Sequence, residues 1–219
     1  MITAAQDQAI NTNYHRARIQ KENIDPKCRI CNKADETVNH LVSACSKLAQ
    51  MSNLRRYNKV AAIAHWQIAK NQGLDVPANW WNDTPQPVME NENVKLLWDF
   101  DIQIDRPITA RRPDIVVQHK RIDQTYLIDI AVPADHNVRD KELEKVQKYD
   151  ELRLEIERLW KTKAKVVPIV IGALGTTSRR FEEWLEAVEI RNQRHSLQRQ
   201  ALYGTTTILR QTLGFPESR

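Results

Sequence analysis

The stretch ARRPDIVVQHKRIDQTYLIDIAVPAD, residues 110 to 135, decides the fold. Two short apolar runs, at 112–118 and 125–133, flank a polar segment, a pattern that predicts two antiparallel strands joined by a hairpin. Each run carries one aspartate, Asp114 at the entry of the first and Asp129 in the middle of the second. A buried carboxylate without a partner is costly, so each aspartate is expected to have a cation or strong donors nearby.

Facing side chains on neighbouring antiparallel strands lie about 5 Å apart, close enough for Asp114 and Asp129 to share a divalent ion. Mg²⁺ or Mn²⁺ suits such a site, because Mg²⁺ binds through one or two carboxylates together with waters and substrate phosphate. The alternative is a turn aspartate and a strand aspartate in ordinary salt bridges with Arg111, Arg112 or Lys120.

The segments beyond this hairpin predict the rest of the sheet. Alternating apolar and polar residues at 94–105 indicate a half-buried strand, and the apolar run at 164–175 indicates a strand that is buried on both faces. Amphipathic helices are predicted at 140–163 and 176–195. The order predicts an α/β (α+β) fold, a small mixed sheet flanked by helices.

The N-terminal part has a helical pattern instead. Helices are predicted at 3–21 and 38–71, separated by a loop of turn-forming residues, and a Pro-rich connector at 72–93 follows. We therefore expect three parts, which are a helical module at 1–75, a second domain at 76–190 that holds the sheet, and a basic C-terminal tail at 191–219.

All three cysteines of the chain lie in one cluster with a histidine, Cys28-x2-Cys31-x8-His40-x4-Cys45. Three cysteines and one histidine are a standard set for structural zinc, and the spacing predicts a zinc knuckle at the start of the second helical stretch. Disulfides explain the set poorly, because three cysteines leave one unpaired. The remaining alternative is three unrelated buried thiols beside a core histidine.

The charge is unevenly distributed along the chain, which has a net charge of +5. Residues 12 to 59 carry ten Lys and Arg against four Asp and Glu, whereas residues 71 to 110 carry two against seven. Basic flanks around an acidic middle suit a nucleic-acid binder, although an unevenly decorated solvated surface would look the same. The predicted nucleic-acid contacts are Arg16, Arg18, Lys27, Arg29, Lys33, Arg111 and Arg112.

No apolar run approaches the roughly 20 residues of a membrane span, so no membrane partner is expected and the protein is interpreted as intracellular.

The spacing of Pro113-Asp114 and Asp129 resembles the PD-(D/E)xK nuclease motif, which also asks for a lysine two residues after the second acid. Ala131 occupies that position here. Lys145 and Tyr149, at i and i+4 of the predicted helix, can supply the missing groups from another element. The alternative is that both belong to a solvated helix face.

Taken in order, the zinc-knuckle spacing, RPDIVV, LIDIAVP and KVQKY resemble the C-terminal region of a non-LTR (LINE-type) retrotransposon protein, in which a restriction-like endonuclease follows the reverse transcriptase. The resemblance covers nearly the whole chain. It implies a restriction-endonuclease-like core that nicks target DNA and supplies a 3′-hydroxyl for reverse transcription. It also implies Asp114, Asp129, Lys145 and Tyr149 as catalytic residues. Further acidic ligands would come from among Glu90, Glu92, Asp99 and Asp101.

The resemblance further implies target DNA as substrate, a possible role for element RNA, the reverse-transcriptase domain of a parent polyprotein as partner, and a nuclear location. No reverse-transcriptase motif is present in this sequence, which would make the chain a fragment, an excised gene or a domesticated remnant. Two rival hypotheses are a catalytically inactive nucleic-acid-binding protein that keeps the fold and the knuckle, and a zinc-stabilised interaction module.

Overall fold

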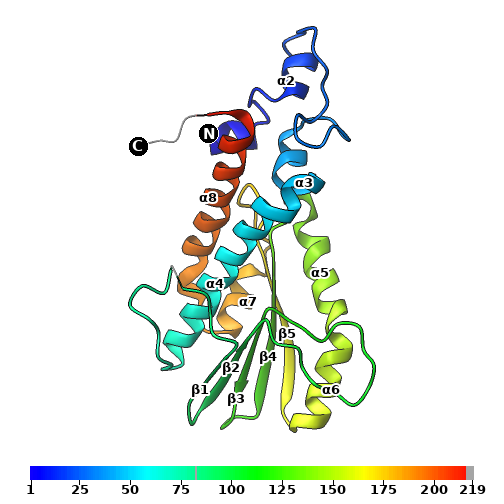
Figure 1. The fold of residues 1–219 in the computed structure, drawn as a ribbon. Coiled ribbons are helices and arrows are strands. Elements are labelled where there is room, and N and C mark those ends of the chain that lie inside the picture. The colour runs from blue at the N-terminus through cyan, green and yellow to red at the C-terminus, as the bar shows by residue number, and fades with distance from the viewer. Residues whose placement is uncertain (82, 216–219) are drawn as a thin grey trace.

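A five-stranded mixed sheet forms the centre of the fold in a computed structural model that describes residues 1–81 and 83–215 (Figure 1). The strands are adjacent in chain order, and the first three neighbouring pairs are antiparallel, whereas the fourth pair is parallel. They are β1 (Val88–Glu90), β2 (Val94–Trp98), β3 (Ile115–His119), β4 (Gln124–Ala131) and β5 (Lys163–Val170). The predicted hairpin of two antiparallel strands, β3 and β4, is confirmed, as is the mixed sheet flanked by helices.

The remaining elements are helices and helical turns. The N-terminal ones are α1 (Ile2–Gln6), α2 (Asn13–Arg18), the π-helical turn η1 (His40–Ala44), α3 (Ser46–Leu48), the π-helical turn η2 (Ala49–Asn53) and α4 (Leu54–Asn71). The later ones are η3 (Asp135–Asn137), α5 (Val138–Lys148), α6 (Asp150–Trp160), α7 (Phe181–Ala187), η4 (Arg191–Gln193) and α8 (Arg194–Leu213).

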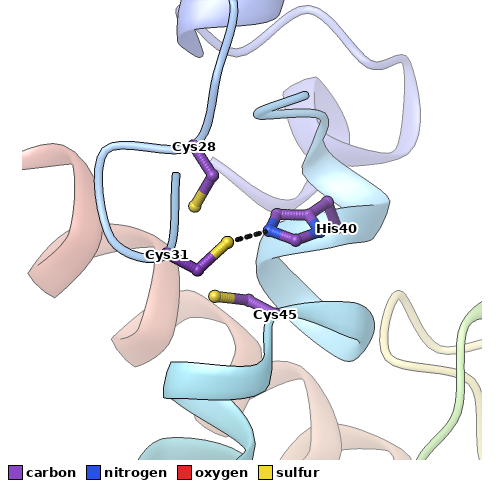
Figure 2. A group of neighbouring side chains, drawn as sticks. All are labelled: Cys28, Cys31, His40 and Cys45. Atoms are coloured by element: carbon purple, nitrogen blue, oxygen red, sulfur yellow. Dashed lines mark hydrogen bonds between the residues drawn. The ribbon is translucent and has the colours of Figure 1, made fainter. Parts of the chain in front are cut away.

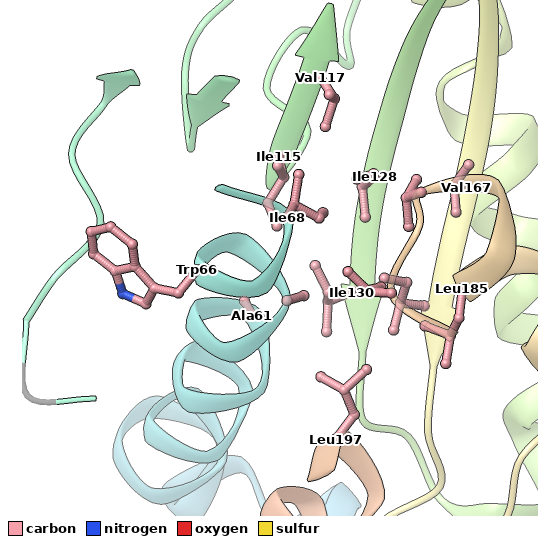
Figure 3. Packing of buried hydrophobic residues seen from close by; sticks show 14 of the residues in the cluster. Ala61, Trp66, Ile68, Ile115, Val117, Ile128, Ile130, Val167, Leu185 and Leu197 are labelled. Carbon is pink, nitrogen blue, oxygen red and sulfur yellow. The ribbon is translucent and has the colours of Figure 1, made fainter. Parts of the chain in front are cut away.

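Helices cover both faces of the sheet, so the core has two sides (Figure 1). On one side, α4, α7 and α8 pack on strand residues such as Ile115, Ile128 and Ile130 (Figure 3). On the other side, α6 packs on Leu127 and its neighbours. Successive residues of a strand point to opposite faces, so an almost continuous apolar run is what a strand buried on both faces requires.

The N-terminal helix predicted at 3–21 is wrong, because this segment forms the two short helices α1 and α2. Gln8 has a positive φ of 55°, which a continuing right-handed helix cannot contain. The second helix then has a start of its own, where the Thr12 hydroxyl oxygen accepts a hydrogen bond from the backbone N–H of His15 at 3.2 Å.

Two other predicted helices are each interrupted. The stretch 38–71 is broken at Cys45, whose φ and ψ of −70° and 114° are extended. The helix predicted at 140–163 is divided into α5 and α6 at Tyr149, which is almost fully buried, and β5 already begins at Lys163. Periodicity extends across both breaks, which is why the pattern alone did not reveal them.

The edge of the sheet also differs from the prediction. The strand predicted at 94–105 ends at Trp98, since Asp99 has a positive φ of 45°. The short strand β1 lies within the segment predicted as a connector and pairs with β2. Pro85 and Pro87 precede it, so the proline residues mark where the edge strand starts.

The segment predicted as a basic tail is largely a helix of the fold. The helix α8 buries Leu197, Ala201, Ile208 and Leu209, the first two in the same core as α4 and the sheet. Residues 216–219 of the predicted tail, like Asn82 of the predicted endonuclease domain, lie outside the described residues. The three-part domain division stays a prediction.

Arg56 links the N-terminal module to the rest of the chain. Its guanidinium is buried and donates to the Thr205 hydroxyl of α8 and the Val42 carbonyl of η1, both at 2.7 Å, and to the Val132 carbonyl after β4 at 3.3 Å. Burial lowers the pKa of Arg56 to about 10. Gly204 lies against this side chain, where a Cβ would overlap it.

Candidate active site and metal centre

The four predicted zinc ligands meet at one point (Figure 2). The ligand atoms of Cys28, Cys31, His40 and Cys45 all lie within 4.8 Å of one another. Tetrahedral zinc with bonds of about 2.0–2.3 Å needs ligand atoms roughly 3.5 Å apart, so this set is compact enough to hold the ion. The structure therefore brings the predicted cluster together and is compatible with structural zinc.

The local backbone explains how His40 and Cys45, five positions apart, bring their ligand atoms to the same point. The Cys45 N–H donates to the His40 carbonyl at 2.8 Å, which closes a π-helical turn and brings the two side chains to one side. Thr37 fixes the start of this turn, because its hydroxyl accepts from the His40 N–H at 3.0 Å. In this arrangement the Cys31 sulfur lies 3.2 Å from Nε2 of His40.

Glu36 is a supporting residue that the sequence reasoning missed. Its fully buried carboxylate accepts from the backbone N–H groups of Asn13 and Arg29, each at 2.8 Å, and pairs with the Arg29 guanidinium at 2.8 Å. Burial acts to raise the pKa of Glu36, but these donors outweigh it and leave the pKa lowered. Glu36 therefore ties α2 to the loop that carries Cys28.

The two strand aspartates lie opposite each other at the end of the β3–β4 hairpin. Ile115 pairs with Ile128, so one further step of the same register sets Asp114 against Asp129. Asp114 Oδ2 accepts from the backbone N–H of Ile130 at 2.5 Å. Asp129 is buried at 2% exposure, and directly opposed residues of antiparallel strands point to the same face.

Two lysines of α5, the helix that packs beside β5, lie next to the Asp129 carboxylate. Lys145 Nζ lies 2.5 Å from Asp129 Oδ2, and Lys148 Nζ lies 3.8 Å from Oδ1. Lys145 therefore occupies the place next to the second acid that Ala131 leaves unfilled on the strand. The structure brings Asp129 and Lys145 together as the sequence led us to expect, although their catalytic roles stay predictions.

Two tyrosines complete the cluster. The Tyr149 hydroxyl donates to the Arg112 carbonyl at 2.9 Å, and burial followed by the nearby Asp129 charge raises the Tyr149 pKa. The Tyr57 hydroxyl of α4 donates to Asp114 Oδ1. Sequence reasoning missed Tyr57, because it lies 57 positions before Asp114 and no local spacing connects the two.

The pKa of Asp114 is raised from 3.8 to about 7, first by burial and then by the charge of Asp129. The hydrogen bonds from Tyr57 and Ile130 and the charge of Lys145 oppose this increase. Two carboxylates that share a confined space resist simultaneous ionisation unless a cation joins them. The electrostatics of the pair therefore favour proton or cation uptake.

The acid pair Asp114 and Asp129, with the lysines and tyrosines around it, lies between two clefts. One, of about 810 Å³, is lined by Lys145 and Ile130 and reaches the cysteine and histidine cluster at His40. The other, of about 790 Å³, is lined by Asp114. Tyr57 lines both, so it separates the two openings of the site.

Most of the predicted nucleic-acid contacts are ion-paired on the surface. Arg16, Lys27, Arg29, Arg111 and Arg112 each pair with an acid, whereas Arg18 and Lys33 are exposed and have no side-chain partner among the described residues.

Of the candidate further acids, Asp99 lines the same cleft as Asp114, but its carboxylate pairs with Arg112 at 2.6 Å.

No protein-family model matches this chain, and no curated protein matches it significantly. Within the described residues, no helix is both long and apolar enough to cross a membrane.

Proposed function

We propose that this protein is a metal-dependent DNA endonuclease whose site is the Asp114–Asp129 pair. The observation that carries the proposal is the placing of two acids on opposed strand positions, with Lys145 2.5 Å from the second acid and a cleft on either side. Acid pairs with an adjacent lysine suit phosphodiester hydrolysis, since the acids hold a cation and the lysine offsets the charge of the phosphate.

Asp114 and Asp129 would hold Mg²⁺ or Mn²⁺, which supplies a bound water of lowered pKa and stabilises charge on the phosphate. Asp114 is positioned for this by the Ile130 N–H and the Tyr57 hydroxyl. Lys145 would move from Asp129 to the phosphate or the attacking water once a cation neutralises the carboxylates. Tyr149, buried beneath the pair, would hold the Arg112 backbone in place.

In the form that the retrotransposon resemblance suggests, the product is a nick with a free 3′-hydroxyl, which a reverse transcriptase extends along element RNA in the nucleus. The zinc module and its exposed Arg18 and Lys33 would contact DNA or RNA backbone. This finer assignment rests on the resemblance rather than on the geometry.

A second candidate is a nucleic-acid-binding protein that does not cleave. The observation in its favour is that protein groups already contact both acids, since Lys145 is ion-paired with Asp129, and Tyr57 and Ile130 donate hydrogen bonds to Asp114. Such a closed set would be stable without any cation.

Nicking of supercoiled plasmid separates the two candidates. The zinc-loaded protein should relax the plasmid in Mg²⁺ or Mn²⁺ but not in Ca²⁺, and a DNA polymerase should extend the nicks if they end in a 3′-hydroxyl. A plasmid that stays supercoiled yet shifts on a gel in a salt-dependent way would support binding alone.

A further inference from the structure

We infer that the cleft lined by Asp114 receives an unpaired DNA nucleotide, whose base stacks on Trp81. The inference rests on the proposed function and deepens it by naming the form of the substrate. The preferred DNA would be single-stranded, or locally unpaired, next to the scissile phosphate.

The cleft has a helical wall, a connector wall and a floor at the site. One helical face forms the first wall, through residues at i, i+3, i+4, i+7, i+8 and i+11, which are Met51, Leu54, Arg55, Asn58, Lys59 and Ala62. The connector contributes Trp81, and the floor includes Trp98 and Asp114. A volume of about 790 Å³ lies within the range of about 300 to 1,000 Å³ that is usual for small-molecule sites.

Apolar side chains around this opening are unusually exposed. Met51 is 78% exposed, Leu54 51% and Trp81 62%. Trp80 holds Trp81 edge-to-face with a centroid separation of 6.0 Å, and Trp80 itself packs against the main core. Gathered exposed apolar residues mark interaction sites, and an exposed indole held in place is a ready stacking surface for a base.

The cations on the helical wall favour a nucleotide over an apolar peptide as the occupant. Arg55 and Lys59 are exposed on the helical wall, and neither has an ion-pair partner within residues 1–81 and 83–215. Of the acids that line the cleft besides Asp114, Asp99 pairs with Arg112, whereas Asp83 is exposed and has no ion-pair partner among the described residues. Two free cations beside an aromatic surface are the usual components of single-strand binding, in which cations follow the backbone and aromatic rings stack the bases.

The position of Asp114 connects the cleft to the reaction. A phosphate at the acid pair would have its neighbouring nucleotide within reach of the cleft, since Asp114 belongs to both. In paired DNA the bases are stacked inside the duplex, so only an unpaired nucleotide could place its base on Trp81.

The test measures binding of a short oligothymidylate and of a duplex of the same length to the zinc-loaded full chain, without Mg²⁺ or Mn²⁺, by tryptophan fluorescence. Trp81→Leu should weaken single-strand affinity on the order of tenfold, remove part of the quenching and leave duplex affinity unchanged. Trp81→Phe should restore most of the affinity, and Lys59→Gln should reduce its salt dependence.

Tyr203→Leu is the matched control, because Tyr203 is an aromatic residue of α8 that is 60% exposed and lines neither cleft. Trp81→Leu binding the single strand as tightly as the wild type would overturn the inference, as would equal weakening for single strand and duplex. Absence of single-strand binding in the wild type would overturn it too. The assay needs no cleavage, so failed nicking with Trp81-dependent binding would count against the nuclease and not against this cleft.

Discussion

The substitution Asp114→Asn should stabilise the protein relative to the wild type, and this difference in the free energy of unfolding should grow as the pH rises. The folded-state pKa of Asp114 is about 7 against an ordinary 3.8, so the folded protein binds more protons than the unfolded chain between these values. Stability is therefore lost as the pH rises through this window, because the carboxylate must ionise beside Asp129. Asparagine is a neutral mimic of the protonated acid and carries no such penalty.

The full shift corresponds to about 4 kcal/mol at 1.36 kcal/mol per pKa unit. Asp114 keeps some contact with water at its cleft, so we expect about half of this, ~2 kcal/mol, at pH 8. The carboxamide oxygen can still accept from the Ile130 N–H, and the amide can donate to the Tyr57 oxygen, so both contacts survive the substitution.

Urea unfolding of the wild type and Asp114→Asn at several pH values from 5 to 8 measures the effect. Zinc binding is itself pH-dependent, but both proteins share it, so the difference between them isolates Asp114. The difference should grow with pH, and added Mg²⁺ should stabilise only the wild type, since ligand binding to the folded state raises its stability. A difference that stays constant with pH would refute the account of the acid pair.

Three further changes have defined outcomes. Tyr57→Phe removes the hydrogen bond to Asp114 and should slow plasmid nicking about tenfold or more without changing DNA affinity, as single-turnover assays and gel shifts can measure. Cys45→Ser should release zinc to a chromogenic chelator and unfold the N-terminal module, seen as lost helical circular dichroism, and an unchanged zinc content would contradict the ligand assignment. Gly204→Ala should lower stability by about 1–3 kcal/mol in thermal melts, because its Cβ overlaps Arg56, although alanine at an open helix position would raise stability.

The parts of the site that local patterns encode could be predicted from the sequence. The spacing of Cys28, Cys31, His40 and Cys45 identified a cluster that the structure brings together. The apolar runs around Asp114 and Asp129 identified a hairpin, and its register sets the two acids opposite each other. Both signals lie within short stretches of chain.

The remainder depended on contacts between distant residues. Tyr57 reaches Asp114 only because α4 packs across the end of the hairpin. The burial of α8 in the core was missed in the segment predicted as a basic tail, because its buried face uses small residues such as Ala201 and Thr205, which give a weak hydrophobic period. Helix breaks such as Tyr149 follow from tertiary packing, which overrides local propensity.

The most direct test of the central claim compares nicking of supercoiled plasmid in Mg²⁺ by the wild type and by Asp129→Asn. Asp123→Asn makes the same chemical change at the other end of the same hairpin and serves as the control. The wild type and Asp123→Asn should nick the plasmid, whereas Asp129→Asn should bind DNA but leave it supercoiled. Equal nicking by Asp129→Asn and the wild type would contradict the assignment of the site.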